Sequence, residues 1–248
     1  MAKPLIILAI MLAAVATSLP AQARIVADVT QRLIAITTAF SGAQVVLFGA
    51  SEPGSDVVVV VKGPARDHSV QRKDRIAGIW MNAAEVVFED VPVFYAIATN
   101  RPMEDIADPD VRRGLDLGLD VLNLRPVAGT SLDKGELASF RQALIRNKQE
   151  VELYAREVGA VRFLGDTLFS TRIDFPNNIP PGSYDVEVLE IRDGQVVAAQ
   201  SSVIAISKLG LEANLFEFAK GQPAMYGVVA ILIAVVSGLL AGWVFRKD

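Results

Sequence analysis

The sequence predicts a mainly β protein: an antiparallel, immunoglobulin-like β-sandwich with an inserted helical segment, followed by one C-terminal transmembrane helix. Short runs rich in Val, Ile, Phe and Thr recur between turns that contain Gly or Pro, which favours several short strands. The chain has 248 residues and is 52% hydrophobic, with a mean hydropathy of +0.37. Both values are higher than those of an ordinary soluble protein. The excess lies largely at the two ends, which leaves a normal globular mixture between them.

Residues 1–23 have the three parts of a secretory signal peptide. Lys3 precedes the apolar run Leu5–Val15, and Ala21–Ala23 supplies a small-x-small cleavage site. The alternative is an uncleaved anchor helix, but the run is short for the roughly 20 residues that a span requires. Either form places the following body on the far side of the membrane.

Residues 24–101 form the first β-rich region. The unbroken run Val57–Val61 is expected to be buried on both faces of its sheet. The cysteine and tryptophan hallmarks of true immunoglobulin domains are missing. The expected strands are residues 32–38, 44–49, 56–62, 85–88 and 92–99.

Residues 102–160 are expected to form a helical connection. Asp108 followed by Pro109 predicts a helix start, with the helix continuing to about Leu122. A longer helix is expected from Asp133, where Glu136 completes a capping-box-like pair. Its apolar stripe should pack against the sheets and consists of Leu137, Phe140, Leu144 and Val151.

Residues 161–207 form a second β-rich segment. Asp185–Val188 alternates polar and apolar residues, and Asp193-Gly194 is a strong signal for a two-residue hairpin turn. About 46 residues make a small separate core, so the segment could instead share a core with the first region. The sequence leaves both arrangements open.

Residues 208–224 are expected to form an amphipathic juxtamembrane helix that ends at Pro223. Leu211, Leu215 and Phe218 recur there at helical spacing beside charged residues. A plain linker is the alternative.

Residues 225–245 predict a transmembrane helix, because about 21 uncharged residues span roughly 30 Å. Tyr226 and Trp243 stand near its ends, where such side chains prefer the membrane interface. Arg246-Lys247 follows within a short cytoplasmic tail, residues 246–248. The expected location is the cytoplasmic (inner) membrane, with the body in the periplasm and the C-terminus in the cytoplasm.

The composition argues against several classes of binding partner. The formal net charge is −4 and there is no cysteine. An acidic chain argues against a nucleic-acid partner and against broad electrostatic adhesion to anionic lipid. The missing cysteines exclude disulfides and thiol chemistry, and no cofactor is expected. The lipid bilayer is the one partner that the sequence implies directly.

A basic cluster stands out in the acidic body and is a candidate surface for an anion or a partner. Charged residues that guard solvated strand edges would give the same pattern. The cluster consists of Lys62, Arg66, His68, Arg72, Lys73 and Arg75.

Catalytic and metal signals are weak. His68 is the single histidine, which rules out metal sets with two histidines. A group of acids could in principle bind calcium, but it lacks the EF-hand spacing, and helix capping already accounts for Asp108. These acids are Glu104, Asp105, Asp108 and Asp110.

Within the membrane segment, small residues recur every four positions. This spacing puts them on one helix face, where a second helix can approach closely. The alternative is the general abundance of small residues in membrane helices. The candidate packing face is Ala230, Ala234, Gly238 and Gly242.

Several segments resemble the putative transmembrane protein family of alphaproteobacteria, and the resemblance covers nearly the whole chain after residue 23. Its members have no assigned activity, so no catalytic residue can be transferred. Their association with permeases of the sulfite-exporter type implies an accessory role in transport. The similar segments are Leu33–Thr37, Val46–Ala50, Val59–Pro64, Arg72–Trp80, Phe94–Ala96, Val161–Leu164, Arg192–Gly194 and Phe216–Ala219.

Two hypotheses of function follow. The first is a non-enzymatic accessory or interaction subunit of a membrane system, such as one that transports sulfite or another anion. Its helix would pack against a multi-span permease or a second copy of the chain. The alternative is a membrane-anchored periplasmic enzyme, which would require a pocket where acids converge near His68.

Overall fold

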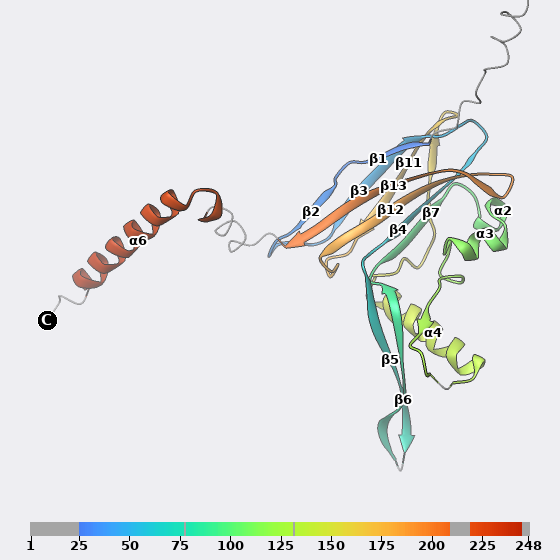
Figure 1. The fold of residues 1–248 in the computed structure, drawn as a ribbon, viewed down its shortest axis with the longest axis horizontal. Coiled ribbons are helices and arrows are strands. Elements are labelled where there is room, and N and C mark those ends of the chain that lie inside the picture. Colours follow the sequence, from blue (N-terminus) through green and yellow to red (C-terminus); the bar gives the residue numbers. More distant parts are fainter. Residues whose placement is uncertain (1–24, 77, 131, 209–218, 245–248) are drawn as a thin grey trace, which may run out of the picture.

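The computed structural model describes residues 25–76, 78–130, 132–208 and 219–244 (Figure 1). The expected signal peptide, the cytoplasmic tail and most of the expected juxtamembrane helix lie outside these residues. Within them the protein is mainly β, as the sequence predicts, with strands in three sheets.

The first sheet joins the two β-rich regions of the chain. Its strands, in spatial order, are β1 (Val26–Val29), β3 (Ala43–Ala50), β11 (Leu168–Phe175) and β10 (Arg162–Leu164). All neighbours are antiparallel, and β3 pairs with β11 along its whole length. The second β-rich segment is therefore built into the same sheet as the first.

The second sheet has six strands in the order β2 (Leu33–Ile36), β13 (Gln195–Lys208), β12 (Gly182–Arg192), β4 (Asp56–Lys62), β7 (Tyr95–Thr99) and β9 (Gly159–Ala160). The β2–β13 and β7–β9 pairs at its two edges are parallel. The expectation of a purely antiparallel arrangement is wrong at these edges, because long connections let strands from distant parts of the chain join in either direction.

The third sheet is a long hairpin, β5 (Ala65–Ile76) and β6 (Ile79–Pro92), with the short strand β8 (Arg125–Pro126). Figure 1 shows the hairpin extending away from the other two sheets. The sequence predicts only its segment 85–88 as strand, because β5 is rich in charge and lacks a regular apolar alternation. The next predicted strand, 92–99, begins at Tyr95.

Two hydrophobic clusters meet at β4. Val57, Val59 and Val61 lie in the first, which residues from both large sheets form together. Val58 and Val60 lie in the second, which is closed by the β5–β6 hairpin and the helical segment. The prediction that β4 is buried on both faces is confirmed. Because strands of both β-rich regions line the first cluster, they share one core.

The helical segment contains α2 (Met103–Ile106), α3 (Pro109–Gly114) and α4 (Lys134–Glu150). The predicted start of α4 is confirmed, since the carboxylate of Asp133 accepts a hydrogen bond from the Glu136 backbone N–H at 2.8 Å. Phe140 and Leu144 are buried against the second cluster. Val151 is exposed instead, because it caps the C-terminal end of α4.

Helix α3 is shorter than predicted. The chain leaves the helix at Gly114, and Asp116 adopts a φ of 55°. Tyr95 fixes this turn, because its hydroxyl donates to the Asp116 carbonyl at 2.6 Å and accepts from the Gly118 N–H at 2.8 Å. Asp108 stands at the N-cap position as expected, yet its carboxylate accepts from the Gln195 side chain rather than capping the helix.

The C-terminal helix α6 spans Pro223–Val244. Its stretch Pro223–Gly242 is long and apolar enough to cross a membrane, and none of it is buried against other described residues. The helix begins two residues before the predicted start at Met225, in keeping with the preference of proline for the first helical turn.

Candidate functional site

The candidate functional site is the β5–β6 hairpin, which carries most of the basic cluster. Ile76 pairs with Ile79 where β5 meets β6, and Gly78 before Ile79 has a φ of 86°, which glycine adopts easily. Arg75 lies opposite Trp80 in this register. Gly78 was the available sequence signal that the chain reverses direction here.

Helix α4 holds one face of β5. The guanidinium of Arg72 lies 5.7 Å from the centre of the Phe140 ring and 3.5 Å from the Glu136 carboxylate. Val70 shares the second hydrophobic cluster with Phe140 and Leu144. The middle of β5 is thus held against α4 by an ion pair, a cation–π contact and a shared apolar cluster.

His68 continues this contact toward the base of the hairpin. Burial lowers the pKa of His68, and the positive charge of Lys148 on α4 lowers this pKa further. Burial likewise lowers the pKa of Lys148, assisted by the charge of Arg66. The side chain thus favours its neutral form, and its electrostatic neighbour is a cation rather than the carboxylate that would orient a catalytic histidine.

The other residues of the basic cluster do not lie together in the structure. Lys62 donates to the Leu115 carbonyl and the Asp116 carboxylate, both at 3.3 Å, in the loop after α3. Arg66, Lys73 and Arg75 are exposed along the hairpin. The structure therefore brings Arg66, His68 and Arg72 onto the base and middle of β5, Lys73 and Arg75 to its far end, and Lys62 to a different contact.

The far end of the hairpin exposes large apolar side chains. Ile79, Trp80 and Met81 are 66%, 68% and 52% exposed. The side chain of Arg75 donates from Nε to the Gly78 carbonyl at 3.2 Å, which ties this cation to the turn. The basic residues could be recognised in the sequence, but this apolar end could not, because its residues show no predicted strand.

Two of the acids considered for calcium lie beside arginine side chains instead. Asp110 contacts Arg113 at 2.5 Å and Glu104 lies 4.0 Å from Arg112. Among the described residues, no group of three or more His, Asp or Glu side chains is arranged to hold a metal ion.

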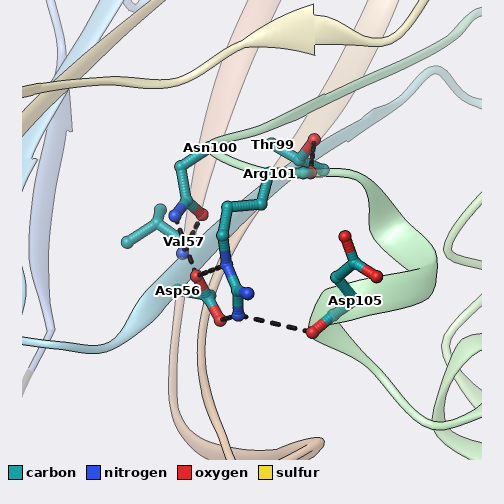
Figure 2. A network of polar contacts seen from close by, with 6 residues as sticks. All are labelled: Asp56, Val57, Thr99, Asn100, Arg101 and Asp105. Atoms are coloured by element: carbon teal, nitrogen blue, oxygen red, sulfur yellow. Dashed lines mark hydrogen bonds and ion pairs between the residues drawn. The ribbon is translucent and has the colours of Figure 1, made fainter.

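A polar network joins the start of β4 to the residues that follow β7 (Figure 2). The Asp56 carboxylate accepts from Arg101 Nε and from the Asn100 side chain, each at 2.8 Å, while Asn100 accepts from the Val57 N–H at 2.9 Å. Arg101 also donates to the Asp105 carbonyl at 3.3 Å. Burial acts to raise the pKa of Asp56, but these hydrogen bonds outweigh it and the pKa is lowered. The network stabilises the strand ends.

One cavity of about 360 Å³ opens between the two large sheets, with Val59, Phe94 and Phe175 inside and Arg156 and Arg172 among its lining residues. Its size suits a small ligand. His68 lines neither this cavity nor the polar one beside Asp56 and Arg101.

The small residues of the membrane segment all fall on α6. Ala230, Ala234, Gly238 and Gly242 are exposed, and added side-chain atoms at Gly238 and Gly242 would meet nothing within 4 Å. The spacing of four residues places them on one face of the helix.

These features define a mainly β protein in which one helix of the described residues is suited to span a membrane. The chain belongs to the family described as "Putative transmembrane protein (Alph_Pro_TM)", whose model matches residues 24–247. This confirms the resemblance seen in the sequence. No curated protein matches the chain. Among solved structures, it is similar to the crystal structure of BslA, a bacterial hydrophobin, at 12% identity and a TM-score of 0.22, over 76% of this chain and 97% of that one.

Proposed function

We propose that the protein is a single-pass, non-enzymatic interaction subunit of a membrane system, with residues 1–23 as a cleaved signal peptide and the β body in the periplasm. The observation that carries the proposal is α6: an apolar helix whose membrane-length stretch is left uncovered by the described residues. A helix of this kind is free to contact lipid on one side and a second membrane helix on the other. We further propose that the paired β sheets form a sandwich.

The small face of α6 supports contact with another helix. Without side chains beyond a methyl group at Ala230, Ala234, Gly238 and Gly242, a neighbouring backbone can approach closely and gain van der Waals contact, which drives helix association in lipid. The partner proposed is a multi-span permease that transports sulfite or another anion, or a second copy of this chain.

The body supports an interaction role over catalysis. The charge that acts on the pKa of His68 is that of the cation Lys148, which opposes protonation. The β5–β6 hairpin instead presents an extended arm with exposed apolar and basic side chains. Such an arm offers an exposed surface for a partner to bind.

The test is crosslinking in the membrane followed by affinity purification of the full chain. The triple variant Ala234→Leu/Gly238→Leu/Gly242→Leu should lose a co-purifying permease or self-crosslink that the wild type retains. The matched control adds bulk to the opposite helix face through Val229→Leu/Val236→Leu/Leu240→Phe and should retain it. A chain that purifies alone as wild type, or a partner retained by the triple variant, would contradict the proposal.

A further inference from the structure

The end of the β5–β6 hairpin combines apolar side chains on both faces of the ribbon. Ile79, Trp80 and Met81 are consecutive on β6 and all exposed. Consecutive strand residues point to opposite faces, so Trp80 lies on one face while Ile79 and Met81 lie on the other. A flat protein surface would cover only one of these faces. If the end of the hairpin inserted into an apolar medium, both faces would be covered.

Charge is distributed unevenly along the hairpin. The segments Lys73–Ile76 and Gly78–Asn82, here called the hairpin tip, contain Lys73 and Arg75 against Asp74. Arg72 lies 3.6 Å from Asp74, whereas Lys73 and Arg75 form no ion pair in the described parts of the chain. The base and middle of the hairpin are acidic, with Asp67, Glu85, Glu89 and Asp90 against Arg66 and Arg72. Only the tip is therefore complementary to an anionic surface.

We propose that the hairpin tip inserts into the interface of an anionic phospholipid bilayer. Ile79, Trp80 and Met81 enter the boundary between headgroups and acyl chains, where tryptophan is favoured. Lys73 and Arg75 contact the lipid phosphates, because juxtamembrane cations are attracted to anionic headgroups. The depth is limited to the interface, since the open edges of a two-stranded ribbon carry backbone groups that cannot remain unpaired in hydrocarbon.

The rest of the chain favours this contact. The membrane helix α6 belongs to the same chain, so the body stays near the bilayer and even a weak contact gains from a high effective concentration. The Arg72 contacts with Phe140 and Glu136 brace the hairpin against α4. This second membrane contact is independent of whether the small face of α6 binds a partner helix.

Trp80 provides a direct probe. The chain has two tryptophans, so Trp243→Phe leaves Trp80 as the single one in the full-length protein. This variant is reconstituted into vesicles of phosphatidylethanolamine with phosphatidylglycerol, or of phosphatidylcholine alone, with brominated lipids as quenchers. We expect strong quenching of Trp80 by lipids brominated near the headgroups in the anionic vesicles, with protection from aqueous acrylamide. Quenching in phosphatidylcholine should be severalfold weaker.

Charge reversal separates the tip from the rest of the surface. Lys73→Glu/Arg75→Glu should lower the quenching severalfold, while the matched reversal Arg162→Glu/Arg172→Glu, at exposed positions of the first sheet, should not change it. Trp80 that remains open to acrylamide in anionic vesicles would overturn the proposal. Protection from acrylamide without quenching by lipid would also overturn it and would indicate that a protein surface covers the tip. Equal quenching in both vesicle types would overturn the requirement for anionic lipid.

Discussion

Arg72 on β5 places its guanidinium over the ring of Phe140 on α4, at 5.7 Å from the ring centre. The same guanidinium lies 3.5 Å from Glu136 in the first turn of that helix. One side chain therefore connects the projecting hairpin to the helical segment. The contact is partly solvated, so its cation–π energy should be modest.

The first prediction concerns this contact. A double-mutant cycle of Arg72→Ala and Phe140→Leu should give a coupling of about 0.5–1 kcal/mol in the free energy of unfolding, the range for a cation–π pair near the surface. The measurement is chemical denaturation of the wild type, both single variants and the double variant. As a control, Lys73→Ala, which is exposed on the same strand, should show no coupling to Phe140→Leu. If the effects of the Arg72 and Phe140 substitutions on the free energy of unfolding are additive, the predicted coupling is refuted.

The second prediction concerns β4 as the strand shared by two cores. Val59→Ala and Val60→Ala should each lower the free energy of unfolding by about 2 kcal/mol, although their side chains face opposite sides, because both are fully buried. Val203→Ala on β13, where the side chain is 49% exposed, should cost much less. Denaturant titration measures all three. A mild effect at Val60 would show that the hairpin and helices do not close the second core in solution.

The third prediction concerns the Asp56–Arg101 pair. The pKa of Asp56 is lowered in the folded state, so the unfolded chain binds its proton more readily as the pH falls. The stabilisation is complete above the unfolded pKa near 4 and is lost as the pH falls through the folded pKa. Asp56→Asn should cost about 1–3 kcal/mol at pH 7 and flatten the dependence of stability on pH below about 4.

Its control is the exposed pair of Asp110 and Arg113. Asp110→Asn should cost less than about 1 kcal/mol, as is usual for surface ion pairs. Thermal or denaturant unfolding between pH 2 and pH 7 separates the two variants. Identical acid profiles for wild type and Asp56→Asn would show that the network in Figure 2 does not stabilise the folded state.

The fourth prediction concerns His68. Its pKa is lowered by burial and by Lys148, so the folded state resists protonation that the unfolded chain accepts. The free energy of unfolding should therefore be highest above the unfolded pKa of about 6.5 and decline as the pH falls below it. Replacement by Gln should remove this part of the pH dependence.

Lys148→Met should raise the pKa of His68 toward its ordinary value, since it removes the cation that opposes protonation. NMR titration of the single imidazole gives the pKa directly. Arg146→Met, on the exposed part of the same helix, serves as the matched control and should leave this pKa unchanged. A pKa of His68 that does not respond to Lys148→Met would show that burial alone sets it.

Much of the fold could be predicted where local pattern and packing agree. The Val57–Val61 run, the Asp133 cap and the Asp193-Gly194 turn each carry a strong local signal, and the structure has β4, α4 and the β12–β13 hairpin at those places. The immunoglobulin-like topology stays a prediction. The early end of α3 could not be predicted, because the Tyr95 hydroxyl that fixes the turn comes from a distant strand.

The candidate site was predictable only in part. Charge density identified Arg72, Lys73 and Arg75, since charge can be counted along a sequence. Their separation from Lys62 depends on tertiary contacts with Asp116, which no local pattern encodes. The apolar end at Trp80 could not be predicted, because the charged sequence of β5 does not indicate a strand that could pair with β6.

The pairing of β3 with β11 has a consequence for how the chain folds. Leu47 meets Thr171, so the first sheet cannot form until a stretch of more than a hundred residues has been produced and brought back upon itself. Closing so long a loop is entropically costly, and chains dominated by such distant pairings fold slowly. A chain that ends before residue 168 lacks β11, so one edge of β3 stays unpaired and the apolar face of the incomplete sheet is exposed to solvent. We therefore expect newly made chains to depend on chaperones until β11 arrives.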